Sequence, residues 1–211
     1  MKMNSHEKNL YNTVLLFGAP GSGKGTWGKI LGMIPGFYHL STGEMFRLLD
    51  TESELGMKVM ESMRKGELVA DDIVFDLWQR HMNNAMLMGT FRPQKDTLIL
   101  DGFPRTPRQV EMLQPIAVVK AIVLLDCADK ELLITRLHKR AVLEHRADDA
   151  NERTIRHRFE IYEREIQKNL AHYPDRIIER IDVSAPPIHI LASLSAALDS
   201  HLIMKNDGVK N

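Results

Sequence analysis

Short apolar runs bounded by turn-forming residues recur along the chain, at 13–17, 97–100, 119–125 and 177–183, and a weaker one lies at 37–40. Near-continuous hydrophobicity over such short runs is typical of strands buried on both faces, and helical patterns fall between the runs. The pattern therefore predicts an α/β fold, in which a five-stranded parallel sheet is flanked by helices.

Helical periodicity is clearest near the C-terminus. One helix face is marked by apolar residues that are four, three and four positions apart: Ile155, Phe159, Tyr162 and Ile166. They predict a helix from about 151 to 169. Another helix is expected from Pro186 or Pro187 to Leu202, because proline suits a first turn.

Two segments interrupt the alternation of strands and helices. Residues 42–89 contain three helical patterns between successive strands, and 139–150 form a short, charge-rich stretch between two helices. We interpret both as excursions from the core of one domain spanning 1–211. Segments of this kind commonly form mobile flaps over a ligand.

Composition excludes several classes of function. The 28 basic and 28 acidic residues balance, which argues against a general nucleic-acid binder. The single cysteine, Cys127, can form neither an internal disulfide nor a multi-thiolate zinc site, and we expect it to be a small buried residue in a protein of a reducing compartment. The polar segment 1–12 lacks the features of a signal peptide, and no run approaches the ~20 apolar residues of a membrane span. We expect a cytoplasmic location, no membrane partner and a frayed tail after Leu202.

The strongest motif follows the first apolar run, where residues 18–26 read GAPGSGKGT. An apolar strand, a glycine-rich turn and a lysine that opens a helix are the layout of a phosphate-binding loop. Its backbone N–H groups and Lys24 converge on phosphate oxygens, and the helix N-terminus favours an anion. A glycine-rich turn without a ligand is the alternative, which the spacing of Gly18, Gly23 and Lys24 disfavours. The loop predicts a nucleoside triphosphate site.

Magnesium is expected at this site. The general motif places Ser or Thr directly after the lysine to hold the metal, but this chain has Gly25 there and the hydroxyl at Thr26. Asp101 follows a buried strand, where ligands gather in open α/β sheets, and its carboxylate can order the water shell of Mg²⁺. The alternative role for Asp101 is a helix cap.

Three further motifs and a set of arginines complete the candidate site. The motifs are STGEMFR at 41–47, GELVADD at 66–72 and DGFPRT at 101–106 with Gln109 after it. The arginines are Arg136 and Arg140 on one helix face, Arg146 in the 139–150 segment, and Arg158 in the following helix. Folding that segment over the phosphate loop would gather guanidinium groups around a transferred phosphoryl group.

Together these motifs resemble the adenylate kinase family, in order and spacing, from about residue 12 to 200. The resemblance implies the P-loop NTPase fold, with an NMP-binding flap at 41–70 and a short lid at 139–150. It implies that ATP contacts Gly21, Ser22, Gly23, Lys24, Gly25, Thr26, Arg136, Arg140 and Ala185. It places AMP on Thr42, Arg47, Glu67, Leu68, Val69, Gly102, Phe103, Pro104, Arg105, Gln109, Arg146 and Arg158. The residues assigned to catalysis are Lys24, Arg105, Arg140, Arg146 and Arg158, with Mg²⁺ held at Thr26 and Asp101 through water.

The resemblance also bears on metal and base specificity. Long lids of the family often carry a four-ligand zinc site, for which this chain lacks residues, so we interpret His138 and His145 as surface residues and expect no structural zinc. Enzymes resembling uridylate–cytidylate kinase carry Ala at the position of Thr42 and Asn at Thr106 and Gln109. Thr42 and Gln109 offer side-chain hydrogen bonds suited to adenine.

The expected reaction is ATP·Mg²⁺ + AMP ⇌ 2 ADP in a monomer. The alternatives are the same chemistry on UMP or CMP, and a catalytically weak nucleotide sensor on the same fold. Departures from the family pattern are Trp27, Glu44, Ala70, one extra residue in 148–154, and the absence of glycine in 182–184. None of them removes a phosphate-handling group, so we expect them to affect rate and donor preference.

Overall fold

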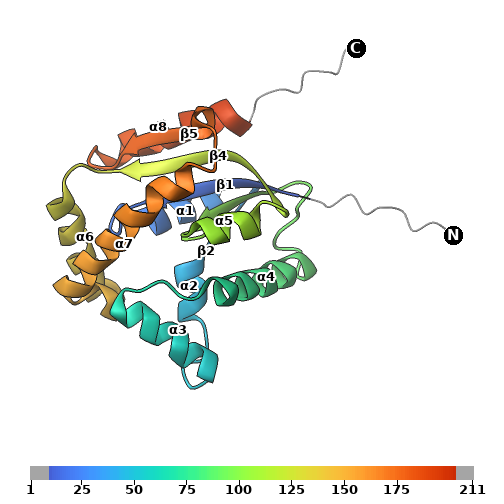
Figure 1. The fold of residues 1–211 in the computed structure, drawn as a ribbon. Helices are drawn as coiled ribbons and strands as arrows, with labels where there is room; N and C mark the ends of the chain where they lie inside the picture. Colours follow the sequence, from blue (N-terminus) through green and yellow to red (C-terminus); the bar gives the residue numbers. More distant parts are fainter. Residues whose placement is uncertain (1–9, 203–211) are drawn as a thin grey trace, which may run out of the picture.

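The computed structural model describes residues 10–202 (Figure 1). The frayed tail predicted after Leu202 and most of the N-terminal segment 1–12 lie outside these residues. Among the described residues, no helix is long and apolar enough to cross a membrane.

A five-stranded parallel sheet forms the centre of the molecule, with the strand order β2-β3-β1-β4-β5. The strands are β1 (Tyr11–Gly18), β2 (Phe37–Ser41), β3 (Thr97–Asp101), β4 (Ala117–Asp126) and β5 (Ile178–Asp182). Each predicted apolar run is a strand, so the predicted sheet is confirmed. Because all strands are parallel, their carboxyl ends meet at one edge.

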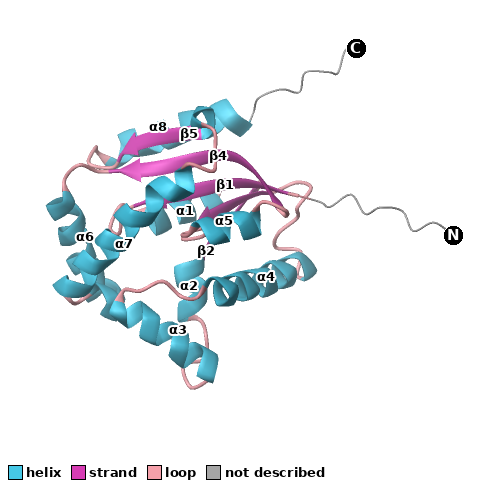
Figure 2. Cartoon of the chain, in the orientation of Figure 1, coloured by secondary structure: helices cyan, strands magenta, loops and turns pink. Residues whose placement is uncertain are grey.

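Helices cover both faces of the sheet (Figure 2). Val14 and Leu16 of β1 belong to a core cluster with residues of α1 (Lys24–Gly32) and α8 (Pro187–Leu202). Leu15 and Phe17 point to the opposite face, in a cluster with α4 (Asp71–Leu87), α5 (Pro107–Leu113) and α7 (Glu152–Leu170). Burial of successive residues on opposite faces explains why β1 has an unbroken apolar run.

The segment 42–89 contains three helices as predicted: α2 (Thr42–Arg47), α3 (Glu54–Lys65) and α4. The prediction that the whole segment leaves the core is wrong for α4. Trp78 is 1% exposed, and its ring stacks on that of Phe103 with centroids 5.6 Å apart. Apolar residues at helical spacing give α4 a buried face, and Met45 and Phe46 of α2 and Val59 of α3 belong to the same core cluster.

The interruption predicted at 139–150 is shorter in the structure. Helix α6 spans Lys130–Glu144, so only 145–151 separate it from α7, and a single turn, η1 (Ala147–Asp149), lies between them. His145 ends α6 in a left-handed conformation with φ 51°. Residues 139–144 stay helical because most of them are good helix formers.

Two smaller predictions have different outcomes. Cys127 is half-buried rather than buried, because the apolar run of β4 ends one residue before it, at Asp126. The predicted C-terminal helices are confirmed as α7 and α8, and each begins within one residue of its expected start.

Candidate active site

The loop between β1 and α1 depends on glycine where it meets α6. Gly21 has φ 82°, and a Cβ atom there would lie 2.6 Å from the carbonyl oxygen of Leu133. Gly23 is left-handed at the N-terminus of α1, with φ 90°. The loop can therefore curl against α6 only without side chains at these positions, and it opens onto the carboxyl edge of the sheet.

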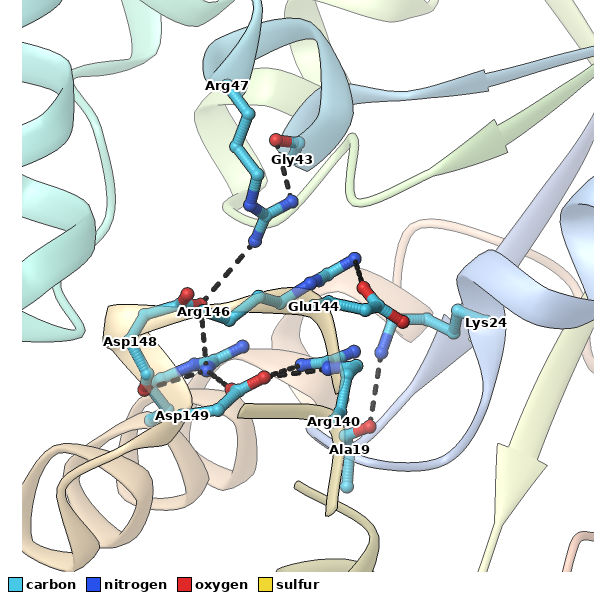
Figure 3. Close-up of polar contacts among 10 residues, drawn as sticks. Ala19, Lys24, Gly43, Arg47, Arg140, Glu144, Arg146, Asp148 and Asp149 are labelled. Carbon is cyan, nitrogen blue, oxygen red and sulfur yellow. Dashed lines mark hydrogen bonds and ion pairs between the residues drawn. The ribbon is translucent and has the colours of Figure 1, made fainter. Parts of the chain in front are cut away.

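Lys24 folds back over this loop. Its Nζ donates to the carbonyl oxygen of Gly18 at 2.6 Å. It also donates to that of Ala19 at 3.1 Å (Figure 3). Burial lowers the pKa of Lys24 to about 7, and the positive charges of Arg105, Arg140 and Arg158 add to this shift, whereas Asp101 opposes it. The ammonium group therefore lies among other positive charges, and a bound anion would offset their mutual repulsion.

Two adjoining pockets lie beside the loop. The first, of about 650 Å³ including its open mouth, is lined by Lys24, Pro104 and apolar residues of α7. The second, of about 570 Å³, is lined by Arg47, Gln109 and the 66–69 segment. We call them the phosphate pocket and the acceptor pocket. Both include Gly66, Leu68, Gly102, Arg105 and Arg158, so cationic side chains lie where the two pockets meet.

Two acids of η1 hold three of the predicted arginines. Asp149, which is 0% exposed, accepts from Nε of Arg140 at 2.6 Å and from Nη1 of Arg158. Asp148 lies 3.0 Å from Nη1 of Arg158 and 3.6 Å from Nη2 of Arg47. Figure 3 shows Asp148 and Asp149 between α2 and α6, so this turn links the two predicted flaps by charge.

The electrostatic balance around Asp149 favours its charged form. Burial acts to raise its pKa, but the hydrogen bond from Arg140 and the charges of Arg158 and Arg140 outweigh burial, so the net pKa is lowered. Arg146 pairs with Glu144 rather than with these acids, its Nη2 lying 2.6 Å from that carboxylate (Figure 3), but burial and the nearby charge of Arg146 both lower the pKa of Arg47. Of the four arginines that were expected to gather, Arg140 and Arg158 share the carboxylate of Asp149, and Arg146 lies near them with its own acidic partner.

Arg136 and Ala185 lie on the other side of the loop. Arg136 donates from Nη2 to the carbonyl oxygen of Val183 at 2.9 Å, which brings α6 next to the segment that follows β5. Ala185 belongs to that segment, is half-buried and packs against the α1/α8 core cluster. Arg136 and Ala185, two of the nine residues assigned to ATP, thus lie outside both pockets.

On the acceptor side, the predicted base-contacting residues have partners within the protein. Thr42 is 1% exposed and donates from Oγ1 to the carbonyl oxygen of Asp101 at 3.4 Å. The amide of Gln109 donates from Nε2 to Asp71 at 2.8 Å and accepts from the backbone N–H of Arg105 at 2.7 Å. Gln109 lines the acceptor pocket and Thr42 does not.

Several other predicted residues have clear positions. Phe103 is 1% exposed within the core, so only its main chain can face a ligand. Asp101 caps no helix, since the N-cap of α5 is Thr106, and this removes the alternative role. His138 and His145 are exposed. The remaining members of the predicted set lie as follows: Ser22 is buried in the loop, Gly25 and Thr26 are in the first turn of α1, and Glu67, Leu68 and Val69 line the acceptor pocket.

The described residues contain no group of three or more His, Cys, Asp or Glu side chains that could hold a metal ion. One carboxylate does fit a metal carried by a substrate. Asp101 is 7% exposed, and its Oδ2 lies 3.6 Å from the position that a Cβ atom on Gly25 would take. Mg²⁺ usually retains several waters and binds through one or two carboxylates plus phosphate oxygens, which suits this arrangement.

Sequence reasoning missed three acids in the site. Asp148 and Asp149 lie in the charge-rich segment 139–150, where two adjacent acids among several arginines are a signal for ion pairing. Asp71 belongs to the GELVADD motif at 66–72, which by itself indicates no partner for it. Its contacts with Thr106 and Gln109 join residues that are 35 and 38 positions away, and no local pattern encodes them.

Comparison with known proteins gives a consistent result. A family model for adenylate kinase matches residues 16–178. An adenylate kinase of Thermus thermophilus is 33% identical over 192 residues, covering 88% of this chain and 96% of that protein. An adenylate kinase of Thermobifida fusca is 35% identical over 195 residues, covering 89% and 98%. Adenylate kinase isoenzyme 1 of Gallus gallus is 32% identical over 202 residues, covering 93% and 99%.

The fold, the phosphate loop and these matches together define a nucleoside monophosphate kinase, which is a phosphotransferase with a P-loop. The family match then specifies the group: the chain belongs to the adenylate kinase family. Adenylate kinases in general use Mg·ATP. Membership favours phosphoryl transfer between ATP and AMP over the alternatives of a UMP/CMP kinase and a nucleotide sensor.

Proposed function

We propose that the protein catalyses ATP·Mg²⁺ + AMP ⇌ 2 ADP across the junction of the two pockets. The observation that carries this proposal is the cationic junction itself, where Lys24, Arg105 and Arg158 line one cavity. Two nucleotides with their phosphates directed at this junction bring an acceptor oxygen in line with a γ-phosphate. Positioning and charge stabilisation then supply most of the catalysis.

The donor side is built from the loop and from α6. The N–H groups of 21–26 and the ammonium of Lys24 hold the ATP phosphates, and Arg136 and Ala185 lie at the base and ribose. Lys24 exchanges its two carbonyl partners for phosphate oxygens when ATP binds. Asp101 orders the water shell of Mg²⁺, and Thr26 contributes its hydroxyl from the first turn of α1.

The acceptor side is built from α2, the 66–69 segment and the loop after β3. Arg47 and Arg105 face the AMP phosphate, while the main chain of 67–69 and Gln109 contact the base. Gln109 presents one free N–H and one free oxygen lone pair, because each half of its amide has a single partner in the protein. This pair matches the N1 acceptor and the N6 donor of adenine.

The lid is 139–150 and the acceptor flap is 41–70. In the structure, Asp148 and Asp149 neutralise Arg47, Arg140 and Arg158, the groups that the transferred phosphoryl requires. Arriving phosphates compete with these carboxylates for the guanidinium groups, and Arg146 joins them as the lid closes. Closure excludes water, which would otherwise convert transfer into hydrolysis.

The protein works as a cytoplasmic monomer whose partners are its nucleotide substrates. All proposed contacts to both nucleotides come from one chain, so activity requires no second copy. Neither nucleic acid nor a membrane enters the reaction.

A coupled assay for ADP tests this proposal, with ATP·Mg²⁺ and each of AMP, UMP, CMP and GMP as acceptor. We expect turnover on AMP alone and loss of this turnover in Lys24→Ala. Lys29→Ala is the matched control, because Lys29 lies on the same helix, is exposed and pairs with Glu44. Preference for UMP or CMP would contradict the assignment of the base site. ATP binding without turnover on any acceptor would indicate a sensor.

A further inference from the structure

Asp71 makes contacts that go beyond its place at the start of α4. Its Oδ1 accepts from Nε2 of Gln109 at 2.8 Å and from Oγ1 of Thr106 at 3.0 Å. Thr106 is the N-cap of α5, and its Oγ1 in turn accepts from the backbone N–H of Gln109 at 3.2 Å. One carboxylate oxygen therefore ties the start of α4 to the start of α5 and fixes both the main chain and the side chain of Gln109.

These contacts decide which way the Gln109 amide points. Its oxygen faces the backbone N–H of Arg105, and its NH₂ group faces Asp71. A flipped amide would bring NH₂ against an N–H donor and oxygen against a carboxylate, two repulsive contacts in a side chain that is only 2% exposed. Only one orientation of the amide satisfies both neighbours, and Asp71 is the charged neighbour.

The orientation of the amide matters because Gln109 lines the acceptor pocket. Adenine presents an acceptor at N1 and a donor at N6. Hypoxanthine has the same shape but presents a donor at N1 and an acceptor at O6. An amide held in one orientation matches one of these edges and opposes the other, and a buried polar mismatch discriminates strongly.

We propose that Asp71 is a positioning residue that sets the base specificity of the acceptor pocket by holding the Gln109 amide in the orientation complementary to adenine. This inference rests on the proposed function, because it takes AMP as the acceptor. Asp71 touches neither the phosphates nor the donor side, so its effect falls on recognition of the acceptor base.

The test compares three variants in steady-state kinetics with AMP or IMP as acceptor. Asp71→Ala removes the acceptor oxygen, whereas Asp71→Asn retains one. Asp72→Ala is the matched control, since Asp72 is the neighbouring acid in the first turn of α4 and is exposed. It preserves Asp71 while removing a similar charge from the helix N-terminus. Thermal unfolding of each variant separates altered recognition from loss of fold.

We expect Asp71→Ala to raise the KM for AMP about tenfold, because the variant loses one buried charge-assisted hydrogen bond. The kcat and the KM for ATP should stay within about twofold of the wild type, and the ratio of kcat/KM for IMP to that for AMP should rise about tenfold. Asp71→Asn should restore most of the AMP affinity and selectivity, and Asp72→Ala should match the wild type.

Three results would overturn the inference: Asp71→Ala kinetics equal to those of Asp72→Ala, equal losses for AMP and ATP, or an Asp71→Asn enzyme as impaired as Asp71→Ala. Wild-type protein that does not turn over AMP would refute the proposed function, and the inference would fail with it. If Asp71→Ala unfolds, Asp71→Ser takes its place, because its shorter side chain removes the contact with Gln109. A raised KM for AMP and a raised ratio for IMP then support the inference, and values equal to those of Asp72→Ala contradict it.

Discussion

Lys24 in the phosphate loop and the arginines beside η1 face the same cleft, but different groups hold them. Arg140 and Arg158 share a buried carboxylate, Asp149, whereas Lys24 donates to the carbonyl oxygens of Gly18 and Ala19. The arginines keep their charge with or without a ligand. The pKa of Lys24, about 7, leaves its charge dependent on what occupies the cleft. The arginines are therefore held by a carboxylate of opposite charge, whereas Lys24 is held by uncharged carbonyl groups.

The largest effect that separates the two regions is expected for Lys24→Ala. Loss of a positioned charge at the transferred phosphate should lower kcat by about 10³-fold. Thermal stability should not fall, because the variant removes an ammonium group that the folded protein desolvates. Steady-state kinetics measures the fall in kcat, and thermal unfolding measures the change in stability. A variant with nearly wild-type kcat, or one that is strongly destabilised, would show that Lys24 has a structural role.

Asp149→Ala tests the second region, the arginines beside η1. Its removal leaves Arg140 and Arg158 without their shared carboxylate and should destabilise the protein by about 3 kcal/mol in urea unfolding. Asp76→Ala is the control, since Asp76 forms an exposed pair with Arg80 on α4 and should change stability little. Equal stability of the two variants would mean that the buried cluster contributes no more than a surface pair.

The same cluster predicts a pH dependence. The folded-state pKa of Asp149 is lowered below the unfolded value of about 3.9, so its contribution to stability is present above about pH 4. That contribution disappears as the pH falls through the folded-state pKa. The stability difference between wild type and Asp149→Ala should therefore stay constant above about pH 5 and shrink as the pH falls below about 4. A difference that grows over this range would contradict the sign of the shift.

Lys24 should couple nucleotide binding to proton uptake. With a pKa of about 7 in the free protein, about half of the molecules carry a charged Lys24 near pH 7 and about a tenth near pH 8. Phosphate oxygens favour the charged form, so affinity for Mg·ATP should fall about fivefold between these pH values. Calorimetry in buffers of different ionisation enthalpy measures the proton taken up. Lys24→Arg, which does not titrate in this range, should bind without it, and equal uptake in this variant would assign the proton elsewhere.

The smallest effect is expected for a variant of Arg136. Like Lys24 it is held by a carbonyl oxygen, that of Val183, but it lies outside both pockets. Arg136→Ala should raise the KM for ATP several-fold with little change in kcat, because it removes binding that ground state and transition state share. A fall in kcat as large as that of Lys24→Ala would place Arg136 at the transferred phosphate instead.

The sequence was sufficient to predict the elements whose signal is local. The apolar run 13–17 predicts a strand buried on both faces, and the spacing of Gly18, Gly23 and Lys24 predicts the phosphate loop behind it. Asp101 could be placed because strand ends meet at one edge of a parallel sheet. In each case the physical cause acts within a few residues of the pattern.

Other features depend on partners that are distant in the sequence. Trp78 belongs to the core because its ring meets Phe103, so the extent of the 42–89 excursion could not be predicted. The hydrogen bond from Gln109 to Asp71 joins two helices, and the role of Asp149 depends on which guanidinium groups surround it. Side-chain pairs of this kind form only when the chain has folded, so local sequence patterns do not predict them.

The most direct measurement follows the transferred phosphoryl group itself. ATP labelled at the γ-phosphate is mixed with Mg²⁺, AMP and excess protein, and the products are separated after a single turnover. Transfer across the junction of the two pockets predicts that the label appears in ADP and depends on AMP. Label recovered as inorganic phosphate, or retained in ATP while AMP is bound, would contradict this account.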